Sequence, residues 1–126
     1  AGFAATLGIT ETRRLVGKYV LTREEMDQPR SDAVAITGNW TKYGSTYEIP
    51  WASLIPRGTT NLAVAGRCIS ADHRAHHATK EIPSCFATGE AAGLGSALAL
   101  QHGVAHQGLD VESLRGKLRA AGAYLP

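Results

Sequence analysis

The sequence predicts an α/β fold that is incomplete within these 126 residues. Two short apolar runs at residues 33–37 and 61–65 are bounded by turn residues and are too short for helices, which indicates strands. Residues 84–101 form a longer run that is rich in alanine and glycine and indicates a helix. Aromatic residues make up only 6% of the chain while glycines number 14, so small residues carry much of the packing. The length allows one domain at most.

The first part of the chain is expected to be extended. Residues 12–22 mix β-branched and aromatic side chains with charged ones, a pattern typical of strands. The segment ends in a capping box, in which the Thr22 hydroxyl accepts a backbone N–H and Glu25 reaches back to the cap. This pair predicts a short helical turn that ends by Pro29.

The strands that follow are expected to be short. Residues 33–37 and 47–51 indicate two of them, and residues 56–58 indicate a turn. Residues 61–65 end at Gly66 and have the composition of a central strand.

The longest predicted helix starts after Pro83, with Ser84 as its N-cap. Glycine inside a helix costs about 1 kcal/mol relative to alanine, so the glycines here indicate a face that needs close backbone approach. Residues spaced by four line that face, namely Gly89, Gly93 and Ala97. A final helix is marked by Asp110 as N-cap, by a Leu109–Leu114 hydrophobic staple and by Gly122 at its end.

Composition excludes several classes of protein. The net charge of +2 is too small, and the basic residues too scattered, for an electrostatic nucleic-acid binder. No apolar run approaches the roughly 20 residues of a membrane span, and no leader is visible, so a cytoplasmic protein is expected. Cys68 and Cys85 are expected to be buried free thiols, with a disulfide between them as the alternative.

The strongest chemical signal is a strand, a glycine turn at Gly66, a polar loop with three histidines, and a helix that begins near Ser84 and Cys85. A helix N-terminus presents unsatisfied N–H groups and a partial positive charge, which suit electron-rich oxygens. In open α/β sheets ligands bind where the strands end. These residues therefore indicate a ligand site between the turn and the helix.

This stretch resembles the C-terminal part of FAD-dependent oxidoreductases with the glutathione-reductase-type flavin fold. The turn is matched by Ala65, Gly66 and Arg67, and the helix start by Ile82, Pro83, Ser84 and Cys85. Further resemblance to one branch of that family lies in residues 9–17, 19–22, 47–50 and 110–125. The order and spacing of these motifs together carry the resemblance.

The resemblance implies FAD as cofactor and hydride transfer between a small molecule and the flavin. It implies that residues 1–58 are the end of a β-rich substrate region, and that residues 59–126 are the last strand and helices of a Rossmann-like FAD-binding domain. The residues of the turn would meet the ribityl chain, and those of the helix start would meet the pyrimidine edge of the flavin. Substrate would be met by three side chains, those of His76, His77 and Lys80. Lys80 stands where related sequences usually carry arginine.

The family's N-terminal GxGxxG fingerprint is absent, and Gly93 and Gly95 lie inside a helix rather than at its start. We therefore expect a companion chain or segment to carry the dinucleotide-binding part, and this chain to be a fragment or a subunit.

Other interpretations stay open. The chain could be a non-catalytic piece that completes another subunit. His73 and His76 or His77 have the helical spacing of zinc ligands, which would suit a hydrolase, but no carboxylate is placed as in HExxH. The histidines could also be solvated, and Arg67 and Lys80 could be surface cations that pair with Glu81 or Glu90.

Overall fold

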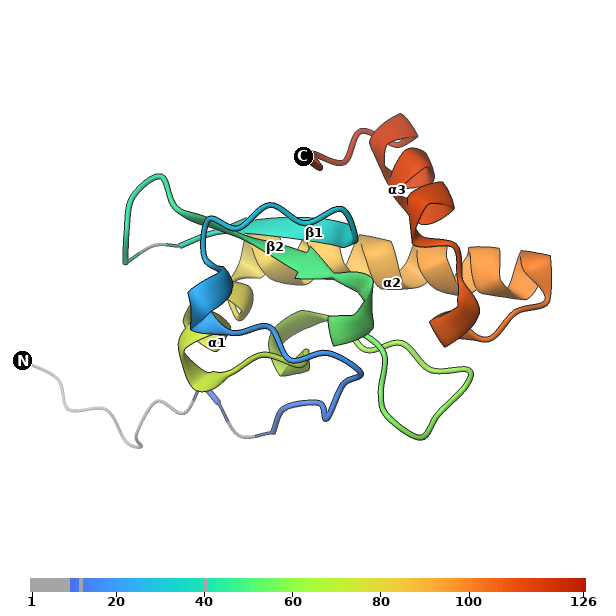
Figure 1. Ribbon diagram of the computed structural model, residues 1–126, viewed down its shortest axis with the longest axis horizontal. Helices are drawn as coiled ribbons and strands as arrows, with labels where there is room; N and C mark the ends of the chain where they lie inside the picture. The colour runs from blue at the N-terminus through green and yellow to red at the C-terminus, as the bar shows by residue number, and fades with distance from the viewer. Residues whose placement is uncertain (1–9, 12, 40) are drawn as a thin grey trace, which may run out of the picture.

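The computed structural model describes residues 10, 11, 13–39 and 41–126. Its strands and helices are β1 (Ala33–Gly38), β2 (Thr46–Pro50), α1 (His73–Thr79), α2 (Ile82–His102) and α3 (Val111–Ala120). Four short 3-10 turns join them, η1 (Arg23–Glu25), η2 (Trp51–Ser53), η3 (Gly66–Cys68) and η4 (His106–Gly108). In Figure 1, α2 passes behind the β-hairpin and extends well beyond it. The helix α3 lies beside the C-terminal half of α2. The fold is thus a mixture of helix and strand, as the sequence predicts.

One hydrophobic core joins these elements. It contains side chains from β1, β2, η2, α1, α2 and α3, and Leu21, Ile49, Leu54, Ile69 and Leu114 are each fully buried within it. The two segments predicted as separate domains, residues 1–58 and 59–126, both contribute to this core. The division between them stays a prediction.

The two strands predicted at residues 33–37 and 47–51 are confirmed to within a residue at each end. They form an antiparallel pair in which Thr37 lies opposite Tyr47, with an irregularity between Ala33 and Ala35. Trp51 does not belong to the strand and begins η2 instead.

The third predicted strand, at residues 61–65, is wrong. The β1–β2 pair is the sheet of the described residues, and residues 61–65 lie outside it with a backbone bond from the Val64 N–H to the Leu54 carbonyl (2.7 Å). A central strand needs neighbours on both sides to pair its N–H and C=O groups. The described part of the chain supplies none here, and Leu62 is left exposed.

The segment predicted to be extended, residues 12–22, pairs through isolated bridges rather than as a continuous strand. Isolated bridges join Gly17 to Pro56 and Leu21 to Ala71, and Thr12 lies outside the described residues. The capping box at its end is confirmed, because the Glu25 carboxylate accepts the Thr22 N–H (2.8 Å) at the start of η1.

The helices begin and end for local reasons. Asp110 caps α3 as predicted by accepting the Glu112 N–H, and Gly122 follows its end with a left-handed φ of 99°. The prediction of Ser84 as the N-cap of α2 is wrong. Glu81 occupies the cap and the helix begins at Ile82, because a proline, here Pro83, fits the first turn, where no N–H is needed.

Close approach along α2 occurs at Gly95 rather than at the face expected from the sequence. A Cβ added to Gly95 would lie 2.5 Å from Cη2 of Trp51, whereas one added to Gly89 or Gly93 would meet nothing within 4 Å. The face of Gly89, Gly93 and Ala97 is exposed in this chain.

A pair of alanine substitutions distinguishes these two faces. Gly95→Ala is expected to lower the free energy of unfolding by about 1–2 kcal/mol, because overpacking against the indole outweighs the gain in helix propensity. Gly93→Ala is expected to raise it by up to about 1 kcal/mol. Urea unfolding followed by circular dichroism measures both values, and equal effects of the two substitutions would contradict this packing.

Candidate functional site

The turn at η3 is bonded to the first turns of α2. The Gly66 N–H donates to the Thr88 hydroxyl (3.0 Å), which in turn donates to the Ser84 carbonyl (2.8 Å). Gly66 has a left-handed φ of 80°, and a Cβ added there would lie 3.7 Å from Sγ of Cys85. The structure therefore brings together the two segments that the resemblance assigns to the cofactor, residues 65–67 and 82–85.

The N-terminal end of α2 is exposed and has no side-chain cap. Its first N–H groups therefore have no partner within the helix, and they carry the positive end of the helix dipole. Ile82 and Pro83 lie at the surface, Cys85 is half-buried, and Ser84 is fully buried. The Ser84 hydroxyl has no hydrogen-bond partner in the described part of the chain. This end of α2 can accept an electron-rich group through its backbone.

The segment predicted as a histidine-rich loop is the helix α1, so that prediction is wrong. Asp72 caps it by accepting the Ala75 N–H (2.6 Å), which satisfies one of the first free N–H groups. The three histidines of this helix differ in how far their side chains are exposed to solvent. His76 is buried, His77 is half-buried, and the side chain of His73 is 70% exposed.

His76 supports the η3 turn from inside the protein. Its Nε2 lies 3.0 Å from the Arg67 carbonyl oxygen, and since a carbonyl only accepts, Nε2–H is the donor. Burial lowers the pKa of His76, with the bond to Arg67 and the charge of Glu11 opposing that shift. The ring predicted to face substrate thus holds the carbonyl of a turn residue.

This burial makes stability depend on pH. Because the folded protein disfavours protonated His76, the unfolded chain takes up its proton first as the pH falls through about 6.5. We expect the free energy of unfolding to fall between about pH 7 and pH 5. His76→Gln, whose amide can still donate to Arg67, is expected to flatten this slope in urea titrations. An unchanged slope would show that His76 does not cause it.

A carboxylate and a histidine form a surface pair that the sequence does not reveal. Oε2 of Glu11 lies 2.5 Å from Nδ1 of His73, and Oε1 lies 2.6 Å from Nε of Arg14. The bond to His73 is the largest cause of a lowered pKa for Glu11, and the charge of Arg14 adds to it. Glu11 also lies 3.8 Å from Nδ1 of His76, so the pair adjoins the support of the η3 turn.

The other two residues predicted to face substrate lie near this pair. The His77 ring meets that of His73 edge-on at 5.2 Å between centroids. The Lys80 ammonium donates to the Thr10 hydroxyl (3.2 Å). Among the described residues, neither Lys80 nor Arg67 forms an ion pair with Glu81 or Glu90.

Both cysteines are free thiols. Cys68 is exposed, so the expectation of a buried thiol is wrong there, while Cys85 lies beside the turn with Sγ 3.6 Å from the Lys80 carbonyl. Across residues 10, 11, 13–39 and 41–126, no group of three or more His, Cys, Asp or Glu side chains is placed to hold a metal ion. No helix in that part of the chain is long and apolar enough to cross a membrane.

Comparison with known proteins identifies the family. Residues 1–118 match the model of the family described as FAD dependent oxidoreductase. No curated protein and no solved structure matches the chain. Because the family match spans nearly the whole sequence and includes both the η3 turn and the start of α2, this chain belongs to the FAD-dependent oxidoreductases, and its cofactor is FAD.

Proposed function

We propose that this chain is the flavin- and substrate-facing C-terminal portion of an FAD-dependent oxidoreductase with the glutathione-reductase-type flavin fold. A companion segment or chain would carry the GxGxxG part, and hydride would pass between a small molecule and the flavin. One observation carries this proposal. The Gly66 turn is bonded through Thr88 to an exposed, uncapped helix N-terminus, which is the arrangement that the resemblance requires.

The residues of the site fit the flavin. Gly66 leaves its turn without a side chain where the ribityl chain is expected, and His76 fixes the carbonyl of the next residue, Arg67. The start of α2 offers N–H groups and a positive dipole to the pyrimidine edge. FAD, when bound, supplies the hydride acceptor or donor. Arg67 and Lys80 would stabilise negative charge on the reduced ring.

Open surfaces beside the site support the proposed companion. Phe86 on the first turns of α2 is 76% exposed, and a Cβ added to Gly89 or Gly93 would meet nothing within 4 Å. Residues 61–65 have the composition of a central strand but no neighbour to pair with in the described part of the chain. Strands and small-residue helix faces of this kind are normally covered.

Flavin reduction potentials test the proposed placement of Lys80. With the companion present and FAD bound, Lys80→Met is expected to lower the two-electron midpoint potential by about 20–30 mV, since roughly 1 kcal/mol of charge stabilisation is lost. Lys117→Met on α3 removes the same charge far from the site and is expected to leave the potential unchanged. Equal potentials in the two variants would mean that Lys80 does not face the flavin.

Catalysis itself is tested by anaerobic mixing with small oxidisable compounds. At least one should bleach the flavin of the assembled protein, and air should restore the colour. A flavin that no compound reduces, although dithionite does, would favour the non-catalytic alternative.

A further inference from the structure

A polar pocket of about 450 Å³ lies between η1, the β-hairpin and α1. Its volume falls within the range of about 300–1,000 Å³ that is usual for small-molecule sites. The walls include three cationic side chains, those of Arg23, Lys42 and Arg74, and no carboxylate. Tyr47 and His77 also line the pocket.

Of the carboxylates near the pocket, Glu24 does not line it, and Asp27 and Asp72 are already bonded to other groups. Asp27 pairs with Lys42 (3.3 Å) and accepts the Thr46 N–H (2.8 Å). The two oxygens of Asp72 accept the backbone N–H groups of Arg23 (3.0 Å) and Ala75 (2.6 Å). Asp72 therefore accepts backbone N–H groups with both oxygens and does not pair with the Arg23 guanidinium.

Two guanidinium groups that line the pocket consequently have no ion-pair partner among the described residues. Among the residues that the structure describes, neither Arg23 nor Arg74 forms an ion pair through its side chain. They come from different elements, η1 and α1, yet line the same pocket. Guanidinium forks match the geometry of carboxylates and phosphates, and two of them facing one cavity strongly favour an anion.

We propose that this pocket binds the oxyanion group of a small molecule, a carboxylate or a phosphate, with Arg23 and Arg74 as its main donors. Lys42 contributes less, because Asp27 already offsets its charge. His77 belongs both to this pocket and to the residues expected to face substrate. The anion would then be part of the substrate itself, a step that rests on the proposed function, whereas anion binding does not depend on it.

Calorimetric titration of the full chain with sodium phosphate and with sodium succinate, at constant ionic strength in chloride, tests the proposal without flavin. One of the two anions is expected to bind, and the preferred one identifies the ligand as a phosphate ester or a carboxylate. Arg23→Gln and Arg74→Gln should each weaken that binding about tenfold, since each removes a charge-assisted contact. Lys42→Gln should weaken it about threefold.

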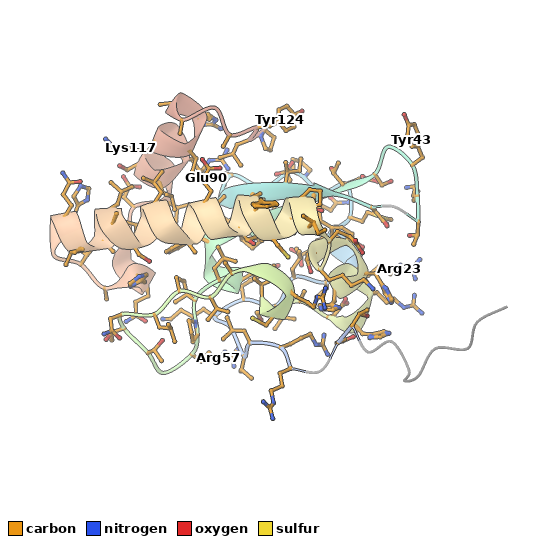
Figure 2. The ribbon with its side chains drawn as sticks, turned by 180° about the vertical axis from the view of Figure 1, so that it is seen from behind. Arg23, Tyr43, Arg57, Glu90, Lys117 and Tyr124 are labelled. Carbon is orange, nitrogen blue, oxygen red and sulfur yellow. The ribbon has the colours of Figure 1, made fainter. Side chains whose placement is uncertain are left out.

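Lys117→Gln is the matched control, because it removes one charge at the opposite end of the molecule from Arg23 (Figure 2). It is expected to leave the affinity unchanged, and circular dichroism shows whether each variant keeps its fold. The proposal is overturned if neither anion binds better than chloride, or if Lys117→Gln weakens binding as much as the arginine variants. Anion binding without any bound flavin in the assembled protein would preserve this site while contradicting the proposed function.

Discussion

Trp51→Ala is expected to lower the free energy of unfolding by about 3–5 kcal/mol, the largest effect of any single substitution considered for this chain. The indole is 4% exposed and packs against Gly95 of α2. Its Nε1–H donates to the His106 carbonyl (2.8 Å), and its ring stacks on that of His106. The substitution therefore leaves a cavity and removes the indole donor from a carbonyl that keeps only a long bond from the Leu109 N–H (3.4 Å).

Two further variants separate these causes. Trp51→Phe keeps most of the packing but removes the N–H donor, and we expect a loss of about 1–3 kcal/mol. Tyr43→Ala removes an aromatic ring that is fully exposed on the β-hairpin, and we expect a change within about 0.5 kcal/mol. Urea unfolding gives all three values. A loss in Trp51→Ala no larger than that in Tyr43→Ala would contradict the described core.

Gly66→Ala is expected to lower the affinity of the assembled protein for FAD about tenfold. The left-handed φ of 80° at Gly66 costs any other residue about 1–2 kcal/mol, so the turn should shift away from its bonded position beside α2. FAD affinity is measured by titrating the apoprotein and following flavin fluorescence.

Gly58 provides the matched control for this substitution. It has nearly the same φ, 78°, and nothing within 4 Å of an added Cβ, but it lies in the turn after Pro56 rather than at η3. Gly58→Ala should cost the same about 1–2 kcal/mol of stability and leave FAD affinity unchanged. If both variants lose FAD equally, the loss reflects general destabilisation and not the η3 turn.

The elements that the sequence predicts correctly are those with local causes. The capping box of Thr22 and Glu25, and the Asp110 cap with its closing glycine, each satisfy backbone groups within a few residues. The two strands at residues 33–37 and 47–51 also follow from local apolar runs, whereas their pairing is seen only in the structure. Such signals are complete within the chain and need no distant partner.

The errors have a different physical origin. Residues 61–65 have a strand's composition, but strand formation needs neighbours that the described residues do not supply. The sequence does not predict the α1 helix because its three histidines and one arginine have the composition of a polar loop, although Asp72 is a good N-cap. The close approach of Gly95 depends on Trp51, which is far away in sequence.

The candidate site likewise combines features that the sequence predicts with contacts between distant residues that it does not predict. The pairing of the turn at Gly66 with the start of α2 follows from the family resemblance, and the structure brings these segments together. The bond between Glu11 and His73 joins residues 62 positions apart, and no local sequence pattern predicts it. The burial of His76 likewise depends on how α1 packs, so sequence reasoning could name the residue without finding what it contacts.

We propose that this chain forms part of an FAD site that a companion segment completes. The most direct test is to purify the chain together with the GxGxxG-bearing segment, denature the complex, and quantify the FAD released. We expect a yellow complex that releases one FAD per chain, and a chain that retains none when it is purified alone. A colourless complex that releases no FAD, although both parts are folded and associated, would contradict a flavin site in this chain.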